Sequence, residues 1–253
     1  SGMSSVLDRL YFSQSAISTY VGCQLRFRRR YLEELYWPRP VSDAVKLGNE
    51  FHALSRRYYL TGKIDEYEGQ VGVWIKNLQQ FRPYDPSFKF YPEQQLRLNG
   101  EIRLVAKYDL VVMADKVYIY DWKTDSKIKK TFYRNSMQTV VYRYLMAAAG
   151  FQYWGRTIKP ADIVMCYWNP AYPNEPLYLP YTEKQYRRDE KNLKDTIKEI
   201  MQKPWDEFFS TSNKALCSRC EYSSTCHGKP GVEEELDPDD LSLSWDDVDD
   251  LIL

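Results

Sequence analysis

The sequence predicts a mixed α/β fold in which helices flank a central β-sheet, and four stretches carry this prediction. Residues 107–124 read as two strands joined by a tight turn, and the second strand is rich in β-branched and aromatic residues. Asn99-Gly100, just upstream, is a strong signal for a hairpin turn. Downstream, residues 131–149 have helical periodicity and residues 162–168 read as a buried strand.

The first part of the chain is predicted to be helical. Ser13 or Ser15 can cap a first helix, because serine accepts a hydrogen bond from the exposed amides of a helix start. A second helix has a continuous apolar stripe, and a third ends where Pro83 and Pro86 break the chain. These helices are expected over residues 13–35, 43–60 and 64–82.

A meander of three strands follows, expected over residues 91–98, 101–113 and 116–123. Gly150 is expected to end the helix that begins at residue 131, because glycine commonly closes a helix. Two more strands and a charged helix that stops before Pro204 complete the order. These last elements are expected over residues 162–168, 176–181 and 182–203.

The chain divides into a basic body and an acidic tail. Its 35 Lys and Arg balance 35 Asp and Glu, but ten of the acids lie at or beyond Glu233, and no Lys or Arg follows Lys229. Residues 1–232 therefore carry a formal charge of +10, which suits a polyanionic ligand. We expect one domain over residues 3–230 and a separate tail over residues 231–253.

The compartment is also expected from composition. No apolar run approaches the length of a membrane span, and no signal peptide is visible. We therefore expect a cytoplasmic, intracellular protein without a membrane partner. Its 22 tyrosines suit base stacking as well as ordinary cores and surfaces.

Charged side chains converge at the end of the strand that contains Asp121. Because side chains alternate across a strand, Asp121 and Lys123 share one face, and Asp109 lies on the neighbouring strand. Two carboxylates can hold a hard divalent cation, and a lysine beside them can orient or deprotonate water. A solvated strand end is the alternative interpretation, since an Asp-x-Lys triplet alone is common.

Two helices contribute further polar residues. Gly48 and His52 are four apart and therefore on one helix face. A single helical histidine is more often structural than a ligand, and because the only other histidine is His227, a multi-histidine metal site is excluded. Gln138 and Tyr142 lie one turn apart on the helix that follows the Asp-x-Lys strand, although an ordinary amphipathic helix also explains them.

The cysteines indicate a second centre, because three of them have Cys-x2-Cys-x5-Cys spacing: Cys217, Cys220 and Cys226. In an intracellular chain this spacing indicates metal thiolates rather than disulfides. Cys23, Cys166 and His227 are candidates for a fourth ligand; Cys166 lies in an apolar strand and reads as core, so Cys23 is the better choice. Four thiolates suit either Zn²⁺ or a [4Fe–4S] cluster, and the spacing does not decide between them.

The order of these motifs resembles that of the RecB-type branch of the PD-(D/E)xK nucleases. The order is a cysteine, Gly-x-x-x-His, Asp, Asp-x-Lys, Gln-x-x-x-Tyr and Cys-x2-Cys-x5-Cys, and it extends from Ser13 to His227. Within that branch it is similar to the CRISPR-associated single-domain exonucleases and to the nuclease domains of bacterial helicase–nucleases that carry an iron–sulfur cluster. Each motif is weak alone, but six in one order are specific. Two positions depart from the common pattern: Ala106 replaces a frequent glycine, and Asp121 replaces a frequent glutamate.

The resemblance implies a restriction-endonuclease-like fold, αβββαβ at its core, with a cluster joining the N-terminal and C-terminal segments. It implies Mn²⁺ or Mg²⁺ as a cofactor, with Lys123 aligning the attacking water and Gln138 and Tyr142 supporting the site or the DNA. The implied ligands of this metal are His52, Asp109, Asp121 and the backbone carbonyl of Trp122. The resemblance also favours [4Fe–4S] over Zn²⁺, held by Cys23, Cys217, Cys220 and Cys226.

The resemblance therefore implies a metal-dependent DNA exonuclease with some endonuclease activity, which prefers single-stranded DNA and acts in DNA repair, recombination or CRISPR spacer processing. Arginines that follow Cys23, including Arg28 and Arg30, would guide the DNA, although a solvated face is the alternative. A catalytically silent DNA-binding or assembly module with a structural cluster is the second reading. A zinc-stabilised binding domain without a nuclease site is the third.

The acidic tail lies outside the resemblance. Its composition is typical of a disordered, solubilising segment. Trp245, Val248 and Ile252 nevertheless recur at helical spacing, so the tail can also dock as a short amphipathic helix. It would then bind a protein partner or cover the basic body and compete with DNA.

Overall fold

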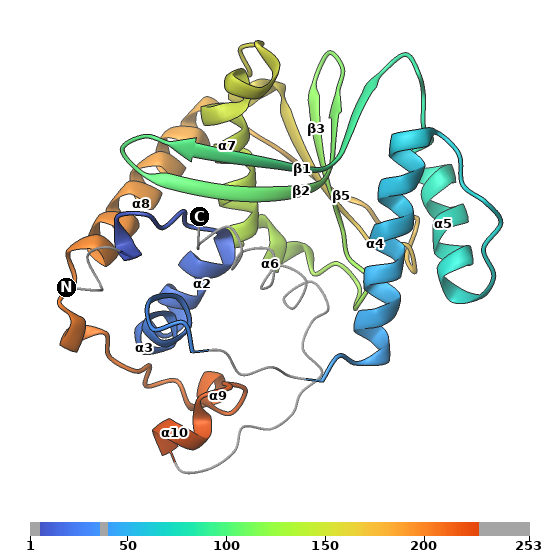
Figure 1. Ribbon diagram of the computed structural model, residues 1–253. Coiled ribbons are helices and arrows are strands. Elements are labelled where there is room, and N and C mark those ends of the chain that lie inside the picture. The colour runs from blue at the N-terminus through green and yellow to red at the C-terminus, as the bar shows by residue number, and fades with distance from the viewer. Residues whose placement is uncertain (1–5, 36–39, 228–253) are drawn as a thin grey trace.

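A computed structural model describes residues 6–35 and 40–227 of the chain (Figure 1). Its centre is a five-stranded sheet whose strands lie side by side in chain order. The strands are β1 (Lys89–Asn99), β2 (Arg103–Met113), β3 (Val117–Trp122), β4 (Ile163–Trp168) and β5 (Leu177–Pro180). β3 and β4 pair in parallel and the other neighbours pair antiparallel, which confirms the expected mixed sheet.

Most helices of the described residues flank this sheet, whereas α9 and α10 lie away from it (Figure 1). They are α2 (Gln14–Gly22), α3 (Gln24–Phe27), α4 (Asp43–Thr61), α5 (Gly69–Phe81), α6 (Lys130–Arg134), α7 (Met137–Trp154), α8 (Glu183–Gln202), α9 (Lys214–Cys217) and α10 (Ser223–His227). Single turns of π-helix and 3-10 helix lie at Arg28–Leu32, Pro160–Asp162 and Trp205–Glu207. Ser13, rather than Ser15, caps α2, and its hydroxyl accepts a hydrogen bond from the amide of Ala16.

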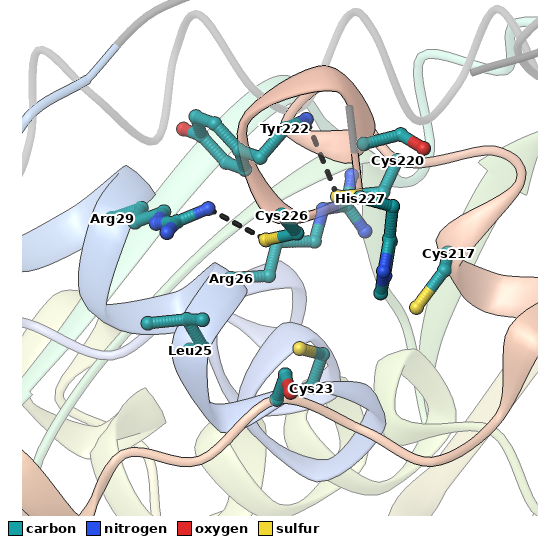
Figure 2. A pocket seen from close by; sticks show the side chains of 11 residues that line it. Cys23, Leu25, Arg26, Arg29, Cys217, Cys220, Tyr222, Cys226 and His227 are labelled. Carbon is teal, nitrogen blue, oxygen red and sulfur yellow. Dashed lines mark hydrogen bonds between the residues drawn. The ribbon is translucent and has the colours of Figure 1, made fainter. Parts of the chain in front are cut away.

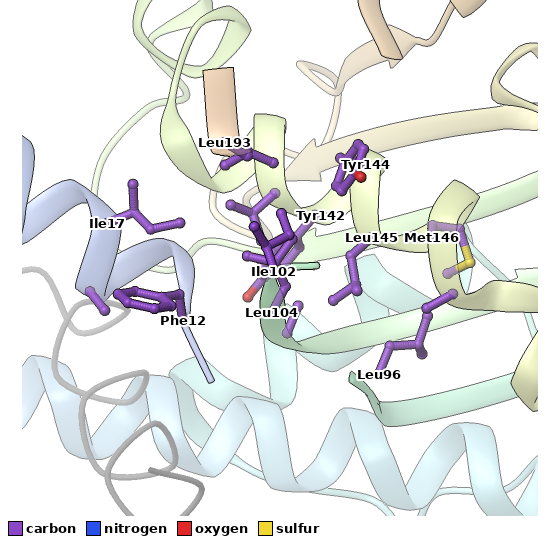
Figure 3. Packing of buried hydrophobic residues seen from close by; sticks show 14 of the residues in the cluster. Phe12, Ile17, Leu96, Ile102, Leu104, Tyr142, Tyr144, Leu145, Met146 and Leu193 are labelled. Carbon is purple, nitrogen blue, oxygen red and sulfur yellow. The ribbon is translucent and has the colours of Figure 1, made fainter. Parts of the chain in front are cut away.

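Each face of the sheet carries its own apolar core. On one face, Val117 and Ile119 of β3 pack with α2, α7 and α8, and Figure 3 shows part of this larger cluster. On the other face, Tyr120 and Trp122 pack with α4 and α5. The strict alternation along β3 decides that Asp121 lies on the α7 face, at the end where the strand leaves the sheet.

Two predicted helices differ from the structure. The segment over residues 13–35 breaks at Cys23, whose backbone is extended, so Cys23 lies between α2 and α3 instead of inside one helix. The segment over residues 131–149 divides into α6 and α7, because the Ser136 hydroxyl accepts from the Thr139 amide and starts a new helix. Gly150 does not end α7; it lies inside the helix, where the Ile158 side chain packs against it.

The pairing of β1 with β2 is interrupted at one position along the two strands. The ladder pairs Pro92 with Leu110 and Gln94 with Tyr108, but skips the intervening residues, Glu93 and Asp109. Glu93 has a φ of 47°, in the left-handed region that L-residues rarely adopt. Up to Tyr108 the even-numbered side chains of β2 face the α7 core, and from Val111 onward the odd-numbered ones do. The kink therefore shifts the alternation of β2 by one residue.

Candidate active site

A buried ion pair lies at the end of β3. The Asp121 Oδ2 and Lys123 Nζ atoms are 3.1 Å apart, and both side chains are almost fully buried. Lys123 follows the last residue of β3, and its amide still donates to the Trp168 carbonyl of β4. The sheet therefore holds both residues, and a buried pair of this kind is stable only when its remaining polar atoms are also bonded.

Gln138, in the first turn of α7, forms hydrogen bonds with both members of this pair. Its side-chain amide donates to Asp121 Oδ1 at 2.9 Å, and its carbonyl oxygen accepts from Lys123 Nζ at 3.2 Å. Asp121, Lys123 and Gln138 thus form a closed triangle of polar contacts. The triangle depends on the break before α7, because the Ser136 cap sets where the first turn of that helix begins.

A second pair joins α4 to the sheet. His52 Nδ1 lies 3.2 Å from Asp109 Oδ1, and the other oxygen of Asp109 accepts from the Trp122 amide at 2.7 Å. Trp122 directly follows Asp121, so this amide brings the Asp109 carboxylate beside the buried triangle. The structure therefore gathers His52, Asp109, Asp121, Lys123 and Gln138 around one strand end.

Tyr142 lies deeper than these five residues. It is buried in the α7 core, where its ring packs 4.9 Å from that of Tyr108 and its backbone carbonyl accepts from the Tyr108 hydroxyl. Gln138 and Tyr142 do share one face of α7, but the contacts of Tyr142 with Tyr108 connect it to the packing beneath the site.

Two aromatic rings that sequence reasoning missed border Lys123. Lys123 Nζ lies 5.5 Å from the ring centre of Tyr133 and 5.8 Å from that of Tyr167, a cation–π arrangement. Burial raises the pKa of Tyr167, and the Asp121 carboxylate raises it further, so this phenol stays neutral and bonds to Thr139. The register of β3 with β4 pairs Asp121 with Tyr167, and this pairing cannot be read from the sequence of either strand alone.

Arg56 and Glu93 also border the site and were not predicted. Arg56 lies one turn beyond His52 on α4, and its Nε atom is 3.3 Å from a Glu93 carboxylate oxygen. The register places Glu93 opposite Asp109. Nothing in the sequence around Glu93 indicates its left-handed backbone, which arises from the kink of two paired strands.

The predicted cluster cysteines line one small pocket, formed where α3 meets α9 and α10 (Figure 2). Cys23 comes from the break between α2 and α3, and the remaining thiols come from the C-terminal end of the described chain: Cys217, Cys220 and Cys226. His227 lines the same pocket. Arg29 donates to the Cys226 sulfur, and Arg26 forms an ion pair with Glu221, so α3 and the π-helical turn after it contribute cations to this region.

The fifth cysteine is separate from the pocket. Cys166 is fully buried in β4 and packs in the core between the sheet and the helices α4 and α5, which confirms the prediction that it is a core residue. Burial raises the pKa of its thiol far above the usual range. It therefore remains a protonated, apolar side chain.

Over the described part of the chain, no group of three or more His, Cys, Asp or Glu side chains lies close enough together to hold a metal ion as placed. The donor types nevertheless fit the expected ions. At the strand end, the Asp109 carboxylate contacts the His52 imidazole and is held beside Asp121, which suits Mg²⁺ or Mn²⁺. In the pocket, the four thiols and one imidazole suit a soft metal or an iron–sulfur cluster.

The two arginines expected to guide DNA have neighbours within the fold. Arg28 donates to the Trp205 carbonyl and lies over the Trp205 ring. Arg30 lies over the ring of Tyr31. Their role toward DNA stays a prediction, and the acidic tail lies outside the described residues. None of the helices in the described ranges is both long and apolar enough to cross a membrane.

Comparisons with known proteins bear on this site. The model of the PD-(D/E)XK nuclease superfamily matches residues 11–73 and 69–227. A crystal structure from Eubacterium rectale, of a protein named provisionally as an exonuclease, aligns with a TM-score of 0.53 at 10% identity, over 93% of this chain and 94% of that one. At such low identity this likeness concerns the fold. The structure of SSO0001 aligns with a TM-score of 0.43 at 15% identity, over 90% and 94% of the two chains. No curated protein matches the sequence.

Proposed function

Since the chain belongs to the PD-(D/E)XK nuclease superfamily, and nucleic acid is therefore its substrate, we propose that it is a DNA exonuclease that hydrolyses phosphodiester bonds and prefers single strands. Nucleases of this superfamily generally use Mg²⁺ or Mn²⁺. The observation that carries the proposal is the gathering of His52, Asp109, Asp121, Lys123 and Gln138 at the end of β3.

The proposed metal ligands are His52, Asp109, Asp121 and the carbonyl of Trp122. Their support is the hydrogen bond from the Trp122 amide to Asp109, which holds carboxylates from two strands beside one backbone segment. When bound, a divalent cation polarises a phosphate oxygen and lowers the pKa of water. The imidazole donor favours Mn²⁺ somewhat over Mg²⁺.

Lys123 is the proposed residue that orients the attacking water. Its ammonium lies 3.1 Å from Asp121 and is held by the Gln138 carbonyl oxygen, so little reorientation is needed when substrate arrives. Gln138 acts as the positioning residue, because it bonds to the carboxylate and to the ammonium at once. Tyr142 supports the packing under that helix turn.

We further propose that Cys23, Cys217, Cys220 and Cys226 hold a [4Fe–4S] cluster, as the RecB-type resemblance implies. The support is their common pocket, which is lined by cysteines from both ends of the described chain. Such a cluster would close a long loop and join the N-terminal and C-terminal segments of one domain over residues 3–230.

The proposed pathways are DNA repair, recombination or CRISPR spacer processing. The tail over residues 231–253 is the proposed binding segment for a protein partner.

The decisive experiment is a cleavage assay with end-labelled DNA. Linear and circular substrates, each single-stranded and double-stranded, are incubated with the full chain and Mn²⁺ or Mg²⁺. We expect loss of nucleotides from linear single strands, slower attack on duplexes, and little cleavage of circles. Strong cleavage of circular DNA would contradict the exonuclease assignment, and faster cleavage of duplexes would contradict the single-strand preference.

A matched pair of variants links the activity to the site. Asp121→Asn removes a proposed ligand and keeps a side chain that can bond to Gln138, whereas Asp115→Asn makes the same change in the exposed turn after β2. Only the first should abolish cleavage. Equal activity of both variants would show that the nuclease activity resides elsewhere or in a contaminant.

A further inference from the structure

The short segment between Lys123 and Gln138 contributes its own surface beside the site. It contains α6, a helix of five residues in which none is buried, and it ends at the Ser136 cap of α7. Chain connectivity therefore places α6 between the proposed water-orienting lysine and its positioning residue. The predicted catalytic and cysteine motifs all lie outside this segment.

Tyr133 is the inward-facing anchor of α6. Its backbone carbonyl accepts from the Thr139 hydroxyl at 2.5 Å and from the Ser136 hydroxyl at 3.2 Å. Its ring lies 4.4 Å from the Tyr167 ring, and Lys123 Nζ lies 5.5 Å from its ring centre. The position of α6 is thus tied directly to the residues around Lys123.

Phe132 faces outward from the same helix. Its side chain is 62% exposed, and its ring stands at 82° to that of Tyr133, with 5.1 Å between the ring centres. The Tyr133 ring therefore lies between Phe132 and Lys123 and contacts both of them. A lone exposed phenylalanine is ordinary on a protein surface, and Phe151 on α7 is equally exposed at 60%. What distinguishes Phe132 is its place beside the site and the charge of its neighbours.

Those neighbours are cationic. Lys129, Lys130 and Arg134 are exposed, and within the described residues none of them takes part in an ion pair. Cations on both sides of an exposed aromatic ring suit a single strand, because the cations can contact phosphates while the ring stacks on a base. A duplex offers no exposed base face to such a ring, except at its ends.

We infer that α6 is a binding surface for single-stranded DNA, in which Phe132 stacks on an unpaired base while Lys129, Lys130 and Arg134 contact the phosphates around it. The inference rests on the proposed action on single-stranded DNA and deepens it, since it assigns the origin of the strand preference to named residues. A base held on Phe132 keeps the adjoining backbone next to Tyr133 and hence next to Lys123.

The test compares the full-length Phe132→Ala variant with Phe151→Ala, a matched change of an equally exposed ring at the far end of α7. Binding of a fluorescent single-stranded oligonucleotide is measured in EDTA, where no cleavage occurs. Loss of one base–aromatic stack should weaken binding about 5- to 150-fold for Phe132→Ala, with no change for Phe151→Ala. Phe132→Tyr retains an aromatic face and should bind like wild type.

Two further readouts separate stacking from a structural effect. An oligonucleotide containing 2-aminopurine should show quenched fluorescence with the wild type and the Phe132→Tyr variant but not with Phe132→Ala. Lys129→Gln combined with Lys130→Gln should reduce the slope of log Kd against log salt by about 1.4, since each phosphate contact to a single strand contributes about 0.7. The same double change at the exposed Lys184 and Lys198 of α8 should leave the slope unaltered.

The outcomes distinguish this inference from the proposed function. If the wild type binds and degrades single strands while Phe132→Ala and Phe151→Ala bind equally well, the α6 surface is refuted and the nuclease proposal stands. If Phe132→Ala weakens duplex binding as much as single-strand binding, α6 is a general electrostatic surface and the stacking role is refuted. If the wild type binds no single strand at all, both the α6 inference and the single-strand preference fail.

Discussion

Asp109 on β2 lies opposite Glu93 on β1 at the position where the pairing between these strands is interrupted. The alternation of β2 breaks at this kink, because Tyr108 faces the α7 core whereas Leu110, two residues later, faces the α4 core. Asp109 lies between them and contacts His52 of α4 and the amide of Trp122 on β3. Glu93 adopts the left-handed backbone that the kink requires and contacts Arg56. The carboxylate at the site is thus aimed by an irregularity of two strands together.

The strain at Glu93 can be measured by comparing two substitutions. Glu93→Gly and Glu93→Ala both remove the contact with Arg56, so their difference reports the backbone alone. Glycine tolerates a φ of 47° and alanine does not, so the glycine variant should be more stable by about 1 kcal/mol. Urea unfolding measures this difference; an alanine variant of equal or greater stability would contradict it.

The buried pair of Asp121 and Lys123 predicts a rescue of stability without a rescue of activity. Asp121→Ala leaves the Lys123 ammonium buried beside Gln138 and should lower the free energy of unfolding by about 3 kcal/mol. Adding Lys123→Met removes that stranded charge and should restore most of the loss. Neither variant should cleave DNA. A double variant as unstable as Asp121→Ala in urea unfolding would argue against this account of the pair.

The cysteines provide a matched comparison for the proposed cluster. Cys217→Ala should lose iron, lose absorbance near ~400 nm and melt at a lower temperature, because iron–sulfur ligation couples to folding. Cys166→Ala changes a buried thiol outside the pocket and should keep its iron. Iron content and thermal melting of anaerobically purified protein measure both effects. Equal iron in the two variants would mean that Cys217 is not a ligand.

Asp189 on α8 predicts a pH dependence that is independent of the site. Burial raises the pKa of this carboxyl, which outweighs its hydrogen bonds with Tyr181 and Gln185 and the charge of Arg143. Because the pKa of Asp189 is raised in the folded state, its protonated carboxyl adds to the free energy of unfolding at low pH. This contribution is fully present below about pH 4 and is lost as the pH rises through the raised pKa.

Asp189→Asn should therefore flatten the decline in stability between about pH 4 and neutrality relative to wild type. Asp195→Asn, in the exposed ion pair with Lys191, makes the same substitution on the same helix and serves as the comparison. Urea unfolding at a series of pH values gives these slopes. Parallel curves for wild type and Asp189→Asn would show that this group does not titrate differently in the folded chain.

Local sequence patterns determined the elements and several site positions of this protein. The alternation over β3 predicted that Asp121 lies on the other face of the sheet from Tyr120 and Trp122, because the side-chain period of a strand is a local property. Ser13 and Ser15 were both recognised as candidate caps for the same reason, and the structure shows that Ser13 is the cap. The superfamily was also readable from the order of motifs, and the family match bears it out at that level.

Only the tertiary structure decided how these positions meet. The sequence alone did not show that Cys23 interrupts a helix, that α7 starts anew at Ser136, that Gly150 lies within α7, or that Glu93 and Asp109 kink together. Each of these features depends on a contact with a residue far along the chain or on which of several possible residues caps the helix. Local propensity predicts neither. The two-residue period of β3 therefore determined which face of the sheet carries Asp121 and Lys123. The packing of α4, α6 and α7 against the sheet decided which residues surround them.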